Sequence, residues 1–197
     1  MYAMKKCFLI MLLPVLFSCN NPAGKSAAGS GTTDSAEING KISPGQLIIP
    51  GEGIAHLTIG LPVDSAVARL GRPDSSDAAM GSALMAWYSK DANRYRTAIF
   101  ARRNMGNEDV SRIKMIMVNS PWFKTKDGIS TGTALAAIEK NYSLKHVDNA
   151  STRQKRVQVF DDINNGIAFD IDSGSKKCIA ITVHAAGDSS GTYINMR

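Results

Sequence analysis

A large apolar residue at every second position of 167–172, Ile-Ala-Phe-Asp-Ile-Asp, most constrains what this chain can fold into. A period of two indicates a strand with one face toward a core and the other toward water. Asn165-Gly166 before it favours a two-residue hairpin turn, and Ser173-Gly174-Ser175 makes a further turn after it. The pattern predicts an antiparallel meander with strands at 156–161, 167–172 and 178–184. In the last strand, we expect Ile179, Ile181 and Val183 to face the core.

The first half of the chain predicts a similar unit. Val63, Val67 and Leu70 have helical spacing, Pro62 suits a first helical turn, and Gly71 followed by Pro73 ends the helix. Strand-like segments follow at 83–89, 95–102 and 110–118, separated by polar, turn-prone segments.

The pattern of a Gly-Ile pair followed by an apolar helical stripe occurs twice, about 72 residues apart. Gly128–Gly132 corresponds to Gly53–Gly60, and Leu135, Ile138 and Tyr142 repeat the stripe. We therefore predict an α+β fold made of two tandem copies of a short helix followed by a three-stranded antiparallel meander. The first copy spans residues 46–122, and the second spans 123–197 and ends in a short disordered tail. One copy of this size would be marginally stable alone, whereas two can close a single core.

Residues 53–73 follow the order Gly-Ile-x(4)-Ile-Gly-x(3)-Asp-x(2)-Val-x(2)-Leu-Gly-x-Pro, with a weaker copy that ends at Tyr142. This motif resembles the small envelope lipoproteins of the BamE/SmpA type and the similar repeats of the β-lactamase inhibitor protein. The resemblance covers most of residues 53–185 and implies a non-enzymatic protein that acts through protein contact. The second copy departs from the motif, since it has Tyr142-Ser143-Leu144 in place of the Gly-x-Pro stop.

The N-terminus predicts export and lipid anchoring. Lys5 and Lys6 precede a short apolar run, which ends at Leu16-Phe17-Ser18-Cys19, and this order is typical of a secretory signal. The run is too short to span a bilayer, which takes about 20 apolar residues. The segment resembles the lipobox of bacterial lipoproteins. We therefore predict a signal peptide at 1–18, with translation starting at Met1 or Met4, and acylation of Cys19.

Residues 19–45 are rich in Gly, Ser, Ala, Thr, Asn and Pro, a composition that predicts a flexible tether. The formal charge of +6 falls to +4 when Lys5 and Lys6 leave with the signal, and the remaining cations are scattered. No dense basic stripe of the kind that binds nucleic acid is present. We expect a protein of the bacterial cell envelope, held in the outer membrane by Cys19 and facing the periplasm, with no nucleic-acid partner.

The residues that carry chemistry lack the context that catalysis or metal binding requires. Gly128–Gly132 spells Gly-x-Ser-x-Gly around Ser130, but no buried strand runs into it as a nucleophile elbow needs. Asp161–Gly166 is rich in oxygen ligands but lacks the bidentate Glu of a calcium loop. The three histidines are far apart in the sequence, and Cys178 is the one cysteine that remains available, which we expect to be a small buried apolar residue. We predict no enzyme activity, no metal and no cofactor.

Trp122 and Phe123 are the candidate site residues, because they lie in the connection between the two copies. Adjacent aromatic residues in a loop can anchor a partner protein, or they can fill the seam between the copies. Trp87-Tyr88 lies within a predicted strand and is expected in the core. The function predicted from sequence is that of a protein-interaction or assembly module. The alternative is a binder of a small ligand or envelope polymer between the two copies.

Overall fold

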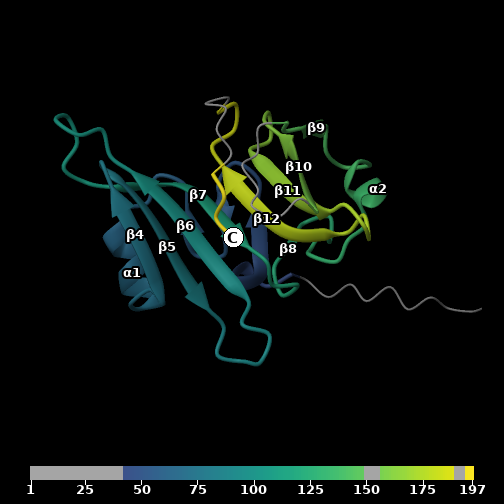
Figure 1. The fold of residues 1–197 in the computed structure, drawn as a ribbon, viewed down its shortest axis with the longest axis horizontal. Helices are drawn as coiled ribbons and strands as arrows, with labels where there is room; N and C mark the ends of the chain where they lie inside the picture. Colours follow the sequence, from purple (N-terminus) through teal and green to yellow (C-terminus); the bar gives the residue numbers. More distant parts are fainter. Residues whose placement is uncertain (1–41, 149–155, 189–193) are drawn as a thin grey trace, which may run out of the picture. The chain divides into compact units, whose positions relative to one another are not determined.

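The computed structural model describes residues 42–148, 156–188 and 194–197, which belong to one compact unit spanning Gly40–Arg197 (Figure 1). The predicted signal peptide, the acylation site Cys19 and most of the predicted tether lie outside the described residues. A short 3-10 helix at Pro44–Gln46 precedes the other elements. These elements are, in chain order, β1 Leu47–Ile49, β2 Gly53–Ile54, β3 Leu57–Thr58, α1 Val63–Leu70, β4 Ser75–Ala79, β5 Ser82–Tyr88, β6 Arg96–Arg102, β7 Arg112–Val118, β8 Lys124–Thr125, α2 Leu135–Ile138, β9 Lys145–His146, β10 Val157–Asp162, β11 Ile167–Asp172 and β12 Cys178–His184.

Eight strands form one antiparallel sheet in the order β4-β5-β6-β7-β12-β11-β10-β9. The two meanders meet at its centre, where β7 pairs with β12 and Ile116 lies opposite Val183. Strands that would be edges in either meander alone are thereby paired, which removes two exposed edges.

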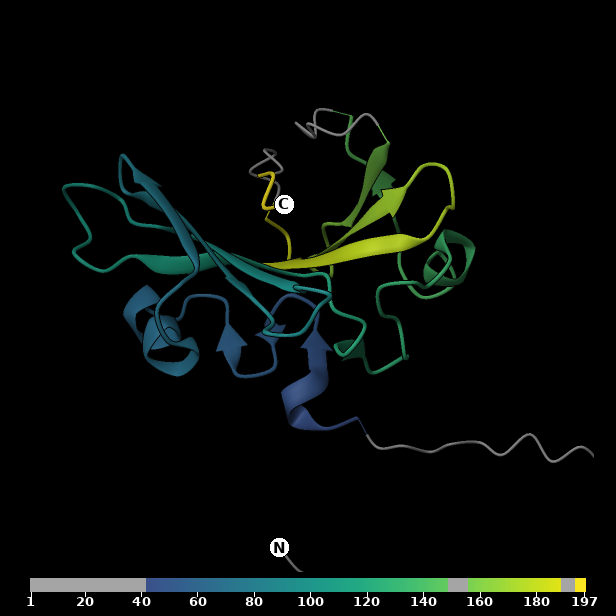
Figure 2. The same ribbon diagram turned by 60° about the horizontal axis from the view of Figure 1, so that its bottom comes forward.

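The first face of this sheet carries the main core. Alternate residues of its central strands point to this face and are fully buried, among them Ile99, Ile116, Phe169 and Val183. A second sheet, in the order β3-β2-β1-β8, contributes Ile48 and other side chains to the same core. Figure 2 shows α1 and the small strands on one side of the large sheet. The domain is therefore two layers around one apolar interior.

The second face of the large sheet carries mainly small side chains at its centre. Ala86, Ala98 and Ala180 lie there beside Met117, and Met196 packs on them, fully buried. The C-terminal residues lie on the side opposite α1 in Figure 2. Arg197 Nε also lies 3.1 Å from the buried carboxylate oxygen Asp170 Oδ2. Residues 194–197, part of the predicted disordered tail, are thus packed against this face; residues 189–193 lie outside the described part.

The predicted fold class is wrong, because the domain is mostly β. Residues 42–148, 156–188 and 194–197 contain twelve strands in two sheets and two short α-helices, of which α2 has four residues. No strand was predicted before the first helix, yet residues 47–58 contain the short paired strands β1–β3. Ile48 of β1 lies opposite Ile54 of β2, and both side chains are buried. The apolar residues of this segment thus reach the core from paired strands. The α2 helix begins after Ala134, whose side chain gives no capping hydrogen bond, and nothing local extends it.

The six strands predicted for the meanders are present as β5–β7 and β10–β12, within about two residues of the predicted ends. Two details differ. Asp162 pairs with Ile167, so the turn holds four residues, Ile163–Gly166, and not two. A bulge pairs Asp170 with Ala180 but Ile171 with Cys178, which leaves Ile179 without an opposite residue and turns Cys178 into the core.

Similar backbone contacts recur in the two halves of the chain, with their first residues 72 positions apart and their partners 65 positions apart. Gly60 N donates to Ile113 O, and Gly132 N donates to Cys178 O. The isolated bridges Pro62–Arg112 and Ala134–Lys177 follow the same two offsets. The sequence recurrence therefore corresponds to repeated anchoring of the chain on a strand of the large sheet, although the elements around the two anchors differ.

Candidate functional site

An aromatic pocket of about 690 Å3 lies where the loop between β5 and β6 meets the connection after β7. Its lining residues are Trp87, Tyr88, Ser89, Asp91, Tyr95, Thr97, Ser120, Pro121, Trp122 and Phe123. Nine of these ten belong to residues 46–122, the first predicted copy. The pocket therefore lies beside one half of the large sheet and not between the two predicted copies.

Strand β5 fixes the floor of the aromatic pocket. Trp87 is 8% exposed, and its Nε1 donates a 2.9 Å hydrogen bond to Gly71 O at the end of α1. Thr97 lies opposite Trp87 in β6. Because side chains alternate along a strand, Tyr88 points to the second face, where the guanidinium carbons of Arg94 and Arg96 lie 5.0 and 5.7 Å from its ring centre.

The connection after β7 forms the other wall of the pocket. Trp122 N donates to Ser120 Oγ at 3.2 Å, and Trp122 O accepts from Gln46 Nε2 at 3.5 Å, so the backbone is held at both groups. Phe123 packs against the main core, whereas Trp122 is 60% exposed. The two adjacent rings therefore differ in role: Phe123 anchors the connection, and Trp122 offers its ring to the pocket and to solvent.

Polar groups on the pocket wall bond mainly to one another. Ser89 Oγ donates to Asp91 Oδ1 at 2.9 Å and accepts from Tyr95 N at 2.7 Å. Asp91 Oδ1 also accepts from the backbone N–H groups of Asn93 and Arg94, at 2.9 and 3.2 Å. These contacts shape the loop and leave aromatic surface as the main feature that the pocket offers a ligand.

The structure brings the predicted site residues Trp122 and Phe123 together with Trp87 and Tyr95. Tyr95 was not among the predicted site residues, and Trp87 was predicted to lie in the core. The alternation of side chains along the strands could have indicated this position for Trp87. Trp87 and Thr97 lie opposite each other near the ends of paired strands, on the same face as the connection after β7. The other predicted site residue, Cys19, lies outside the described residues.

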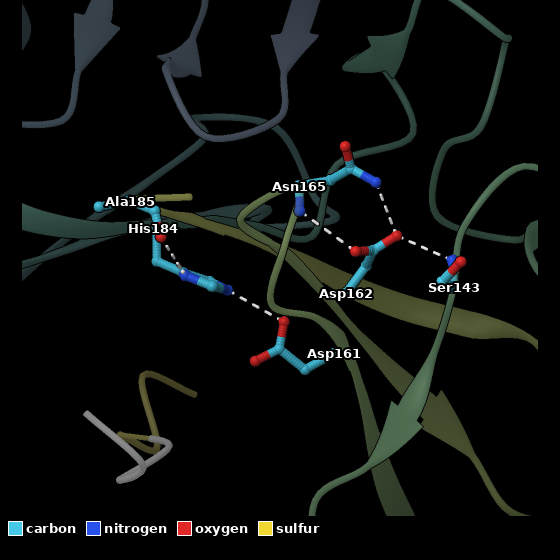
Figure 3. A network of polar contacts seen from close by, with 6 residues as sticks. All are labelled: Ser143, Asp161, Asp162, Asn165, His184 and Ala185. Carbon is cyan, nitrogen blue, oxygen red and sulfur yellow. Dashed lines mark hydrogen bonds and ion pairs between the residues drawn. The ribbon is translucent and has the colours of Figure 1, made fainter. Parts of the chain in front are cut away.

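A separate polar network surrounds the turn between β10 and β11 (Figure 3). Asp161 and Asp162 are neighbours in β10 and point to opposite faces of the sheet. Asp161 Oδ1 lies 3.0 Å from His184 Nε2, and His184 Nδ1 lies 3.0 Å from Ala185 O. Both ring nitrogens thus face acceptors, an arrangement that suits the doubly protonated imidazolium.

The pKa of His184 reflects opposing effects. Burial lowers it, but the hydrogen bond and charge of Asp161, with the carbonyl of Ala185, raise the pKa above its ordinary value. Since each ring nitrogen already has a partner, neither is oriented toward a nucleophile. The pair therefore joins β12 to β10 on the second face of the sheet.

Asp162 is buried and organises the turn that was compared with a calcium loop. Its Oδ1 accepts from Asn165 N at 3.1 Å, and its Oδ2 accepts from Asn165 Nδ2 and Ser143 N, both at 2.8 Å (Figure 3). The carboxylate is therefore used by the protein's own donors. Across residues 42–148, 156–188 and 194–197, no group of three or more His, Cys, Asp or Glu side chains is placed to hold a metal ion.

The side chain of Ser130 is hydrogen-bonded to the backbone, and that of Cys178 is buried. Ser130 Oγ donates to Thr131 O at 3.3 Å, whereas His184 bonds to Asp161, so the Gly-x-Ser-x-Gly segment is not joined to that histidine. Cys178 is 1% exposed and burial raises its pKa to about 12, which confirms it as a buried apolar residue. Among the described residues, no helix has the length and hydropathy needed to cross a membrane.

Comparison with known proteins gives one weak structural likeness. No family model matches the chain, and neither does any curated protein. A solved structure of an extracellular protein containing a SCP domain from Bacillus anthracis str. Ames is similar with a TM-score of 0.44 and 11% identity, over 68% of this chain. The match spans 46% of that structure's length. At this level the likeness carries no argument about function.

Proposed function

We propose that this protein is a bacterial envelope lipoprotein, anchored through acylated Cys19, whose β domain binds a partner protein and has no catalytic activity. The observation that carries the proposal is the exposed ring of Trp122 beside the aromatic pocket. Tryptophan and tyrosine are over-represented among the residues that dominate binding energy at protein interfaces. The volume of about 690 Å3 is sufficient for one or two side chains of a partner.

The chemistry of the pocket indicates what a partner contributes. Ser89 and Asp91 are hydrogen-bonded within the loop, so an aromatic or aliphatic anchor side chain fits the pocket better than a ligand that needs many hydrogen bonds. The loop that lines it also carries the exposed cations Lys90 and Arg94. The proposed ligand is therefore a segment of a partner protein that has an apolar anchor flanked by acidic residues.

Peptide titration tests this assignment directly. The probe is the peptide Glu-Asp-Phe-Asp-Glu, and the readout is tryptophan fluorescence of the full chain, which has two tryptophans. We expect binding of this peptide, weaker binding when its Phe is replaced by Ala, and weaker binding of Lys-Arg-Phe-Arg-Lys. Equal binding of all three peptides would contradict the proposed pocket chemistry. Undiminished binding of Glu-Asp-Phe-Asp-Glu to the Tyr95→Ala variant would contradict it as well.

The anchor has its own test. The Cys19→Ala protein should lack the mass of the acyl chains and leave the detergent phase on phase partitioning, because two or more chains are needed for stable anchoring. Retention of the same mass and partitioning would disprove acylation at Cys19 without affecting the pocket.

A further inference from the structure

A patch of exposed methionines and cations lies at the end of the large sheet away from the loop that lines the aromatic pocket. Met80 is 86% exposed in the turn between β4 and β5, and Met105 is 56% exposed in the loop between β6 and β7. Both line a hollow of about 670 Å3 with Arg102, Arg103 and Lys114. We call these five residues the methionine patch.

The two loops of the methionine patch are packed together. Arg103 N donates to Gly81 O at 2.9 Å. A Cβ placed on Gly81 would lie 2.7 Å from Met105 Cγ, so the methionine side chain rests directly on the turn. The two loops that carry Met80 and Met105 are therefore held side by side.

The backbone at Met80 is unfavourable for this side chain. The turn has φ 50° at Met80 and 78° at Gly81, the left-handed pair that a two-residue hairpin turn requires. Asn, Asp or Gly suits the first position, whereas a long unbranched side chain gains nothing from it. Met80 buries little surface in return, so neither turn geometry nor packing explains this residue. A conformational cost without a structural gain points to a role outside the fold.

The charges of the patch indicate the occupant. Arg102, Arg103 and Lys114 are three cations in one hollow, and Glu108 is its one acidic lining residue. Glu108 Oε2 accepts from Asn104 N at 2.8 Å, which engages the carboxylate within the loop. Cations around exposed apolar tips match a bilayer surface, where the apolar groups enter the headgroup region and the cations stay near lipid phosphates.

We propose that the methionine patch docks the domain on the surface of a bilayer that contains anionic phospholipid. Exposed apolar groups rimmed by polar ones mark membrane or protein contacts, and the excess of cations favours the phosphate-rich lipid surface. This site is separate from the aromatic pocket, and its test does not depend on the proposed partner.

The experiment reconstitutes the full chain from detergent into vesicles and measures tryptophan quenching by brominated lipid. A Met105→Trp variant reports at the patch, and an Asn93→Trp variant, at an exposed residue of the loop between β5 and β6, is the matched control. We expect quenching of Met105→Trp well above that of Asn93→Trp in vesicles containing brominated phosphatidylglycerol, and little difference in brominated phosphatidylcholine alone. Equal quenching of the two variants in both vesicles would overturn the proposal.

Substitutions in the Met105→Trp background separate docking from folding. Met80→Asn should keep or raise the melting temperature, because Asn suits the left-handed turn, and should lower quenching. Each Lys or Arg near an anionic surface contributes about fivefold to the ratio of docked to undocked protein, so Lys114→Gln should lower that ratio by about this factor. Undiminished quenching in both variants would contradict docking through the methionine patch.

Two further outcomes are decisive. Loss of quenching on addition of millimolar inorganic phosphate at constant ionic strength would assign the hollow to free phosphate and overturn bilayer docking. Quenching that appears only when an envelope protein is added would assign the patch to a protein partner instead. Weakening by sodium chloride without a specific phosphate effect supports the proposal, because exposed charges are screened by salt.

Discussion

His184 Nε2 lies 3.0 Å from Asp161 Oδ1 across the second face of the large sheet, and the small residue Ala168 of β11 lies between their two strands. Ala168 faces the same side as Asp161 and Thr182, with which it is paired. A larger side chain at this position would obstruct the contact. The ion pair therefore depends on the alternation of small and polar residues on this face.

This contact predicts a pH-dependent stability. Because the folded-state pKa of His184 is raised above its ordinary value of 6.5, the protonated pair stabilises the fold fully below about pH 6.5. The contribution is lost as the pH rises through the folded-state pKa. Urea unfolding between pH 5 and pH 9 should therefore show a decrease in the free energy of unfolding across that window. In Asp161→Asn the decrease should be smaller, and an unchanged pH profile would contradict the assignment.

A Gly166→Ala substitution should be strongly destabilising. Gly166 has φ 71°, and a Cβ there would lie 2.4 Å from His184 O and 2.8 Å from Gly51 Cα. We expect a cost of about 3 kcal/mol or more, from the left-handed conformation together with the clash. Gly128→Ala is the matched control, since φ is 77° and no atom lies within 4 Å, and should cost about 1 kcal/mol. Equal losses in thermal unfolding would show that close approach at Gly166 has no effect.

Asp162→Ala should unfold the domain more easily than Asp172→Ala. Asp162 is buried and accepts three hydrogen bonds, one of them from Ser143 N, whose partner would be lost. The expected cost is about 2–4 kcal/mol. Asp172 accepts a 2.7 Å hydrogen bond from Ser175 N in a similar turn, but its side chain is partly exposed. Water can therefore hydrogen-bond to Ser175 N when the carboxylate is removed. A loss at Asp162 no larger than at Asp172 in chemical denaturation would contradict the role given to burial.

Local patterns predicted the strands well and the architecture poorly. The alternation in 167–172 and the Gly and Asn turn residues identify β11 and its neighbours, because these signals lie within a few residues of each other. The parallel pairing of β1 with β8 joins Leu47 to Lys124, and nothing near either residue indicates the other. The strand at 75–79, Ser-Ser-Asp-Ala-Ala, has only exposed residues and no large apolar one, so it carries no apolar alternation to detect.

The candidate site was predictable in part for the same reason. Trp122-Phe123 stands out as an aromatic pair in a connection, but its exposure differs between the two residues because only Phe123 reaches the core. Tyr95 and Trp87 join the pocket through pairing of β5 with β6 and return of the connection past β7. This convergence depends on tertiary structure that no local pattern encodes.

The most direct test of binding through the aromatic pocket is a pull-down of the natively processed protein from detergent-solubilised membranes with Trp122→Ala, quantified by mass spectrometry. Leu70→Ala, at an exposed apolar residue elsewhere, is the control. Hot-spot residues contribute about 2 kcal/mol or more, so an envelope protein recovered with wild type and Leu70→Ala should fall at least about tenfold with Trp122→Ala. Equal recovery of that protein with Trp122→Ala would contradict the account, and so would recovery of a small molecule with no protein.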